Sequence, residues 1–194
     1  RSSDRVNVGG RGLEVRLVDF EGRVRERSTR DYAFPDPALV LAEIVLRVQG
    51  IARRLGDAGR ERLQGIGVAA PLSMGGWRDL LHFPPALAEQ WARTDLRGEI
   101  ERQTGLPVEL LKDTSAACVA ELVAGRGRSV RSFAYVFVDT FIGGGLVIDS
   151  HLRSGLRGNA GAIGSIPLGL ANSDGRTAPE QLLSDASLFN LEQL

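Results

Sequence analysis

The stretch from Val136 to Gly169, VFVDTFIGGGLVIDSHLRSGLRGNAGAIGSIPLG, contains the pattern that decides the fold. Apolar, strand-like residues at 133–138 lead into a glycine-containing turn, and a second strand-like run, GLVI, follows it. A strand, a glycine turn and a strand let the backbone wrap a phosphate group. Asp139 and Phe141 lie inside this turn. The stretch is therefore either a working nucleotide loop or one that has lost that role.

Two segments near the start of the chain have clear local patterns. The strand-like LEVRLVD at 13–19, the turn FEG and the polar RVRERST at 23–29 predict a β-hairpin. Asp36 stands as an N-cap with Pro37 in the first helical position. Apolar residues then recur at helical spacing, which predicts a helix that ends near Gly56.

Strands and helices alternate along the rest of the chain. Strands are predicted at 65–70 and 107–111, and a helix is predicted at 114–123. Another single helix is indicated by the spacing of Leu87, Trp91, Leu96 and Ile100. This alternation predicts an α/β fold with a mixed sheet, not a helical bundle or a β-sandwich.

Composition limits the classes of protein to consider. The 194 residues, 43% of them hydrophobic, suffice for one large domain or two small lobes. The 24 basic and 24 acidic residues balance, so no overall field draws this segment to nucleic acid or to an anionic membrane. No apolar run approaches the length of a membrane span. The single cysteine, Cys118, excludes an internal disulfide framework and is expected to be a small core residue in a cytoplasmic protein.

Five segments, in order, resemble the ROK family (repressors, open reading frames and sugar kinases) of the actin-like ATPase superfamily. They are VNVGGRGLEVRLVDFEG, GIGVAAPLSMGG, LPVELLKDTSAACVAE, DTFIGGG and GNAGAIGS. One glycine loop would be a weak signal, but five segments in the family's order are specific. The resemblance implies a two-lobe actin-like, ribonuclease H-like α/β fold with mixed sheets flanked by helices. The first lobe is expected at residues 1–112 and a second, incomplete lobe at 113–194.

The first phosphate loop implied by the resemblance departs from the family pattern. Gly9 and Gly10 match, but Asn7 and Arg11 replace the family's aspartate and threonine. That aspartate helps to hold Mg²⁺ in kinases of the superfamily, and a neutral asparagine is a poorer ligand for this cation. The loop is therefore expected to be degenerate.

The second phosphate loop departs in the same direction. Thr140, Gly143 and Gly145 match the family, whereas Asp139 and Phe141 occupy glycine positions. An aspartate repels phosphate oxygens, and a phenyl ring obstructs the close backbone approach that glycine permits. Nucleotide binding is expected to be weak or absent, so no cofactor is expected. The alternative for these residues is an ordinary tight hairpin turn.

The family's ligand positions correspond to Lys112, Asp113, Asn159, Ala162 and Ser165. Lys112, Ala162 and Ser165 replace an asparagine, a glutamate and a histidine, and each lost buried hydrogen bond would cost roughly 1–3 kcal/mol. This argues against an ordinary hexose bound in the usual way. Lys112 suggests a carboxylated or phosphorylated ligand, unless it is only a solvated lysine at a strand end. The family's cysteine cluster does not follow Ser165, so its structural zinc is expected to be absent.

Asp113 is the one catalytic-type residue that the resemblance retains. It matches the family's general base for the sugar hydroxyl. Its alternative role is the N-cap of a helix that starts at Thr114.

These features favour a catalytically degenerate ROK-type transcriptional regulator, of which the chain is the effector-sensing and dimerising region. The effector would be a small carbohydrate or derivative, and DNA would be bound only by a helix-turn-helix segment before Arg1. The alternative is an ATP-dependent kinase that phosphorylates a hexose or amino sugar, uses ATP and Mg²⁺, and employs Asp113 as base. A third hypothesis is a family member that acts only through protein contacts. The ligand, the operator and the oligomeric state are left open by the sequence.

Overall fold

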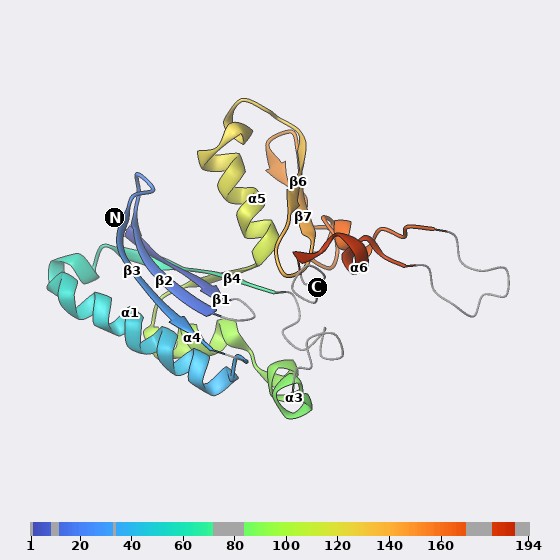
Figure 1. Cartoon of the computed structure of the whole chain (residues 1–194). Helices are drawn as coiled ribbons and strands as arrows, with labels where there is room; N and C mark the ends of the chain where they lie inside the picture. The colour runs from blue at the N-terminus through green and yellow to red at the C-terminus, as the bar shows by residue number, and fades with distance from the viewer. Residues whose placement is uncertain (1, 9–11, 33, 72–83, 170–179, 189–194) are drawn as a thin grey trace. The chain divides into compact units, whose positions relative to one another are not determined.

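The computed structural model describes residues 2–8, 12–32, 34–71, 84–169 and 180–188 (Figure 1). The chain divides into two compact units, Arg1–Asp113 and Thr114–Leu194. No helix in these described ranges is long and apolar enough to cross a membrane.

The first unit is built on a five-stranded mixed sheet. Its strands are β1 (Ser2–Val8), β2 (Gly12–Asp19), β3 (Val24–Asp31), β4 (Leu63–Ala70) and β5 (Val108–Lys112), in the spatial order β3-β2-β1-β4-β5. The first three strands form an antiparallel meander, while β4 and β5 run parallel to β1. The predicted β-hairpin is confirmed as β2 and β3. The carboxyl ends of β1, β4 and β5 consequently lie at one edge of the sheet.

The long helix α1 (Pro37–Arg60) begins where the sequence predicts. Asp36 is its N-cap, and the Asp36 carboxylate accepts the N–H of Leu39 at 3.0 Å. The predicted stop at Gly56 is a break, not an end, because Gly56 takes φ 64° and ψ −178° and one further turn follows it. Glycine tolerates this positive φ at no steric cost.

The single helix predicted through Leu87 and Ile100 is wrong, since the structure has two helices, α3 (Pro85–Arg93) and α4 (Leu96–Thr104). Asp95 separates them because its carboxylate accepts the N–H of Gly98 at 3.0 Å and caps the second helix. The apolar period continues across the break, which is why periodicity alone did not reveal it.

The core of the first unit consists of large aliphatic side chains between the sheet and its helices. Ile44 and Ile100 are fully buried, and the indole of Trp91 donates a hydrogen bond to the Pro35 carbonyl at 2.8 Å. The other fully or nearly fully buried members come from β1, β2, α1, β4, α4 and β5: Val6, Leu13, Val15, Leu17, Val40, Val48, Ile51, Leu63, Ile66, Val68, Ala70, Leu96 and Val108.

The second unit contains a smaller antiparallel sheet. Its strands are β6 (Phe133–Phe137), β7 (Gly143–Ile148) and β8 (His151–Leu152), in the order β6-β7-β8. Helix α5 (Asp113–Ala124) enters this unit, and the short helices η1 (Arg126–Arg128), η2 (Ile163–Ser165) and α6 (Leu182–Ala186) complete the described part. The predicted strands around residues 133–138 and 145–148, and the predicted helix at 114–123, are confirmed.

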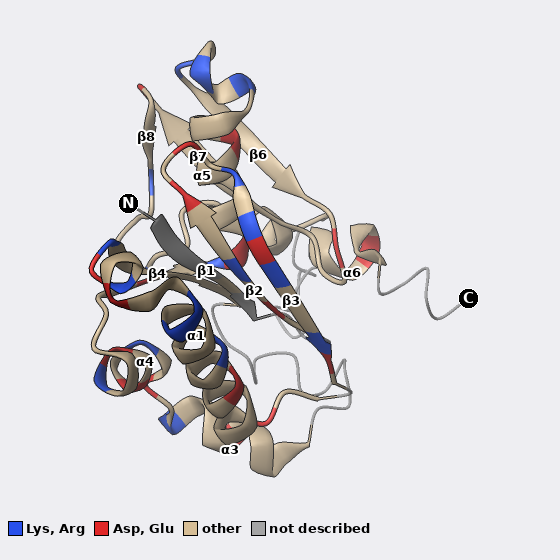
Figure 2. Cartoon of the chain, turned by 90° about the vertical axis from the view of Figure 1, so that its left-hand side faces the viewer, with Lys and Arg blue, Asp and Glu red and all other residues tan. Residues whose placement is uncertain are grey.

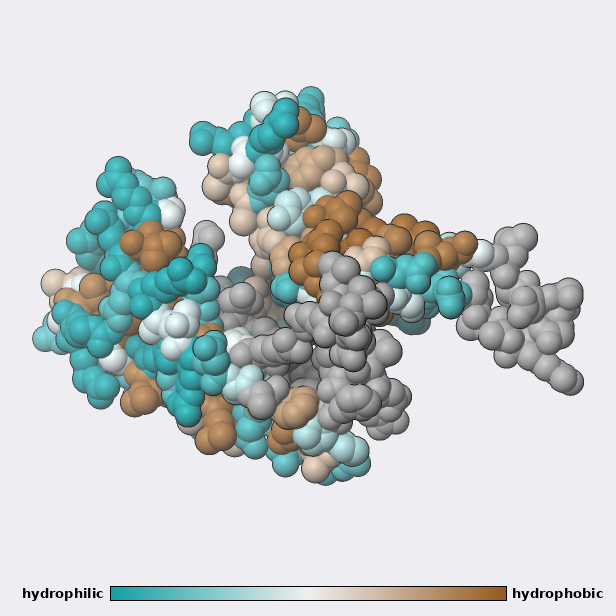
Figure 3. Space-filling model, viewed as in Figure 1, coloured by the Kyte–Doolittle hydropathy of each residue, from teal (hydrophilic) through white to brown (hydrophobic). Residues whose placement is uncertain are grey.

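The edge strand β3 of the first sheet and the edge strand β6 of the second sheet differ in the polarity of their exposed side chains. In β3 charged side chains predominate, and Arg27, Arg30 and Glu26 pair with Glu14, Glu43 and Arg54 respectively (Figure 2). In and just after β6, Val136 and Val138 are 53% and 54% exposed. Figure 3 shows apolar side chains gathered on the second unit, where Figure 1 places the ends of β6 and β7 and helix α6.

Candidate functional site

The first unit brings its candidate residues to the carboxyl edge of the sheet. Asn7 is in register with Ala69 on β4, and Ala70 is in register with Lys112 on β5. Ligands of sheets with parallel strands characteristically bind at this edge. The first phosphate loop, Gly9, Gly10 and Arg11, follows β1 in the sequence and lies outside the described residues.

Lys112 and Asp113 stand where β5 passes into α5, and both are half-buried. The helix begins at Asp113, not at Thr114, so Asp113 belongs to the first turn and does not precede the helix as the predicted N-cap would. A carboxylate in the first turn is favoured by the helix dipole. Both residues make interactions in the structure.

The glycines of the second phosphate loop belong to strand β7, which corrects their interpretation as a tight turn. A Cβ at Gly143 would lie within 3.0 Å of Thr114, and one at Gly145 within 3.0 Å of Cys118. Both contacts face α5, so these glycines let the helix pack directly on the strand backbone. On the other face, a Cβ at Gly144 would lie within 3.0 Å of Ile163.

The family segment around Asn159 packs against the same strand. A Cβ at Gly161 would meet the backbone of Gly144 and Gly145 within 3.0 Å, and one at Gly164 would meet the Ile142 carbonyl. Ala162 and Asn159 are half-buried beside this contact, and Ser165 is exposed at the end of η2. The structure therefore brings the segments 143–145 and 161–164 together, backbone against backbone.

Cys118 is a core residue, as predicted. It is fully buried, and burial, assisted by the nearby charge of Glu121, raises the pKa of its thiol. A thiol that is buried and protonated at neutral pH is a poor nucleophile. Its role is to pack α5 on Gly145.

The connection 138–142 between β6 and β7 has two of its amide donors occupied. The Thr140 N–H donates to the carboxylate of Asp139 at 2.7 Å, and the Ile142 N–H donates to the Ser187 hydroxyl at 3.0 Å. A phosphate-binding loop offers such N–H groups to its ligand. Here a carboxylate and a hydroxyl of the protein accept them.

Ser187, which directly follows α6, holds this connection in place through hydrogen bonds. Its buried hydroxyl donates to the Leu183 carbonyl at 2.6 Å, and the adjacent Leu188 N–H donates to the Asp139 carbonyl at 3.0 Å. Sequence reasoning missed Ser187. Nothing in the local pattern links it to Ile142, which lies 45 residues earlier.

Metal-binding groups are not clustered in the described ranges. Across residues 2–8, 12–32, 34–71, 84–169 and 180–188, no three or more His, Cys, Asp or Glu side chains are arranged to hold a metal ion.

Similar proteins include both kinases and a regulator. An N-acetylmannosamine kinase from Citrobacter koseri is 32% identical in a match 169 residues long, which covers 82% of this chain and 52% of that protein. A ROK family glucokinase from Streptomyces griseus, solved with glucose and AMPPNP, has a TM-score of 0.75 and 25% identity, and the match covers all of this chain and 59% of the other. A ROK family transcriptional regulator, a homolog of the E. coli MLC protein, has a TM-score of 0.70 and 24% identity, with coverage of 99% and 48%.

These matches establish the fold and the family. The chain spans about half the length of the curated relatives it matches. Its fold is the mixed α/β fold of the actin-like ATPases, as the sequence predicted. Residues 5–183 match the ROK family profile, and the chain therefore belongs to the ROK family.

Proposed function

We propose that this chain is the effector-sensing part of a ROK-type transcriptional regulator and does not transfer phosphate. The observation that carries the proposal is the donor pattern of the connection 138–142. The amides of Thr140 and Ile142 are bonded to Asp139 and Ser187, so they are not available for a nucleotide phosphate.

Electrostatic repulsion also disfavours phosphate binding at this loop. To bind a phosphate at Thr140, the loop would have to release its own carboxylate and hold it beside a second anion. Like charges at such short range strongly disfavour one another. The described part of this loop is therefore unsuited to an ATP–Mg²⁺ complex.

The ligand side retains groups that can recognise an anion-bearing carbohydrate. Lys112 ends β5 at the carboxyl edge of the first sheet and supplies a positive charge, and Asp113 follows it with a hydrogen-bond acceptor. A sugar acid or sugar phosphate would satisfy both. Binding would favour one conformation of the protein and change operator affinity through a DNA-binding segment outside these residues. A cytoplasmic homodimer is the form we expect.

The alternative is a sugar kinase, and two features support it. By the sequence resemblance, Asp113 corresponds to the family's general base. An N-acetylmannosamine kinase is also 32% identical to this chain. Under this alternative the protein releases ADP in the presence of a hexose or amino sugar. Asp113→Asn would then reduce the rate by several orders of magnitude, since the base would be lost.

Calorimetry on the whole protein separates these functions. We expect no heat of binding from AMPPNP with Mg²⁺, and measurable binding of a sugar acid or sugar phosphate. Lys112→Gln should weaken that ligand about tenfold or more because it removes a charged hydrogen bond. The exposed Arg93→Gln is the matched control and should leave affinity unchanged.

Two results would contradict the regulator proposal. One is sugar-dependent ADP release that Asp113→Asn abolishes. The other is that no carbohydrate changes the affinity of the protein for its operator. That result would favour a family member that acts only through protein contacts.

A further inference from the structure

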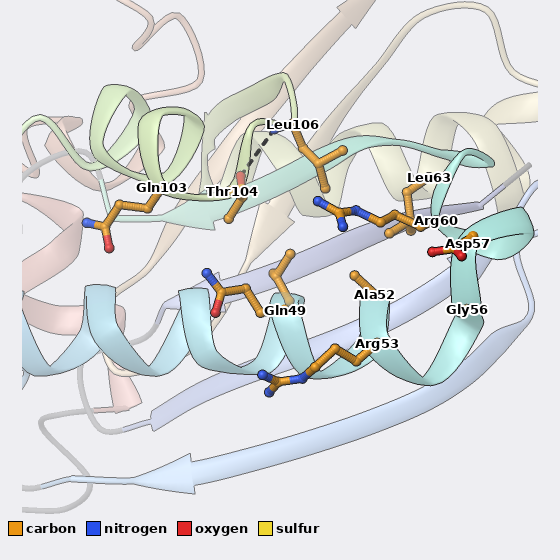
Figure 4. A pocket seen from close by; sticks show the side chains of 11 residues that line it. Gln49, Ala52, Arg53, Gly56, Asp57, Arg60, Leu63, Gln103, Thr104 and Leu106 are labelled. Atoms are coloured by element: carbon orange, nitrogen blue, oxygen red, sulfur yellow. Dashed lines mark hydrogen bonds between the residues drawn. The ribbon is translucent and has the colours of Figure 1, made fainter.

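A concave site lies wholly within the first unit, between α1 and the connection from α4 to β5 (Figure 4). Its volume is about 450 Å³, which is in the range of pockets that hold small ligands. Its lining includes Gln49, Ala52, Asp57, Arg60, Leu63, Gln103 and Leu106.

The break in α1 lies within the lining of the pocket. At Gly56 the helix leaves its regular course, and open space surrounds the position that a Cβ would take. The turn after the break brings Arg60 back along the same side of the helix as Gln49 (Figure 4).

Polar and apolar groups are separated within the pocket. Leu63 and Leu106 lie along one side, and Ala52 faces them from α1. The pocket therefore has apolar walls on two sides. The Arg60 guanidinium projects into the space between Leu106 and α1, with the amides of Gln49 and Gln103 beyond it (Figure 4). The Asp57 carboxylate lines the opposite end of the pocket (Figure 4). Apolar walls with a few convergent polar groups are typical of sites for small organic ligands.

The pocket is distinct from the candidate site at Lys112. Leu63 is the first residue of β4, and Leu106 lies just before β5. The pocket therefore lies at the amino ends of the two strands whose carboxyl ends carry Ala70 and Lys112. Its existence does not depend on the proposed regulator function.

We propose that this pocket binds a small organic anion with an apolar body. A carboxylate or phosphate group would accept hydrogen bonds from Arg60, whose planar guanidinium matches both groups in a bidentate arrangement. The amides of Gln49 and Gln103 would complete the polar contacts, and the apolar body would lie on Leu63 and Leu106.

The test uses benzoate, phenyl phosphate, inorganic phosphate and the neutral benzamide as probes, each titrated to about 10 mM, the concentration scale of weak small-ligand sites. We expect benzoate or phenyl phosphate to bind, and benzamide and inorganic phosphate to bind at least about tenfold more weakly. A preference between the first two distinguishes a carboxylate ligand from a phosphate ligand.

Arg60→Gln should weaken the bound probe about tenfold or more, because it removes the charged donor. Arg62→Gln removes the same charge from an exposed residue outside the pocket and should have no effect. The proposal is overturned if neither aromatic anion binds, if benzamide binds equally well, or if the two variants weaken binding equally.

Discussion

Strand β2 of the first unit and strand β7 of the second unit pack against their neighbours in opposite ways. In the first unit, β2 buries the side chains of Leu13, Val15 and Leu17. In the second unit, β7 begins with Gly143, Gly144 and Gly145, and its neighbours pack on bare backbone. Buried side-chain volume stabilises the packing of β2, whereas the absence of side chains allows close backbone packing on β7.

This difference changes how a glycine motif should be interpreted. The residues Gly143 and Gly145 match a phosphate loop in sequence, yet α5 already requires them to be glycine. Their presence would persist after nucleotide binding was lost. The amide donors of Thr140 and Ile142 are the more informative feature, since a phosphate ligand would need them.

The chain carries a separate natural probe for each unit. Both tryptophans, Trp77 and Trp91, fall within residues 1–113, so fluorescence reports on the first unit. The single cysteine, Cys118, belongs to the second unit and is fully buried, so thiol labelling reports on its opening.

The largest expected effect is the loss of side-chain volume in the first unit. Ile44→Ala should lower the free energy of unfolding by about 4 kcal/mol, because it leaves a cavity at a fully buried position. Denaturant unfolding followed by tryptophan fluorescence measures this. Leu46→Ala, at a position 58% exposed on the same helix, should change stability by less than about 0.5 kcal/mol. Equal losses from both variants would contradict the side-chain core.

Added volume should damage the second unit. Gly161→Ala places a methyl group against the backbone of Gly144 and Gly145, which no rotamer change can relieve. We expect a loss of about 3 kcal/mol and faster labelling of Cys118. Gly169→Ala, which meets nothing within 4 Å, is the control. Unchanged labelling in Gly161→Ala would show that the backbone contact is not needed.

A smaller effect is expected at the start of α1. Asp36→Ala removes the acceptor of the Leu39 N–H and should cost about 1 kcal/mol in the fluorescence transition. Asp36→Asn retains a capping oxygen and should recover most of the loss. If Asn is as harmful as Ala, the carboxylate acts through its charge and not as a cap.

The smallest expected effect depends on pH and is confined to the first unit. Burial alone would raise the pKa of Glu43, but hydrogen bonds from Arg47 and Arg30 outweigh it and hold the pKa below its usual value. The resulting stabilisation, about 1 kcal/mol or less, is present above the unfolded pKa near 4.3 and is lost as pH falls through the folded pKa. The difference between the native protein and Glu43→Gln should therefore be visible at pH 7 and vanish toward pH 3. The exposed Glu89→Gln serves as control, and a difference that persists in acid would exclude the ion pairs as its cause.

Local signals made much of the fold predictable. Asp36 and Pro37 marked the start of α1 because capping involves only neighbouring residues. The break at Asp95 was missed because the apolar period runs through it. The link from Ser187 to Ile142 was not predictable, since it joins segments 45 residues apart. For the same reason, the sequence could identify the glycines of β7 but not what packs on them.

The edge strands β3 and β6 also differ in how readily each would pair with a strand of another molecule. A sheet edge with alternating charges, as in β3, resists pairing with another strand, because approach would desolvate those charges. In and just after β6, the exposed Val136 and Val138 offer no such barrier. Where chains meet at high concentration, lateral growth of a sheet should start at β6.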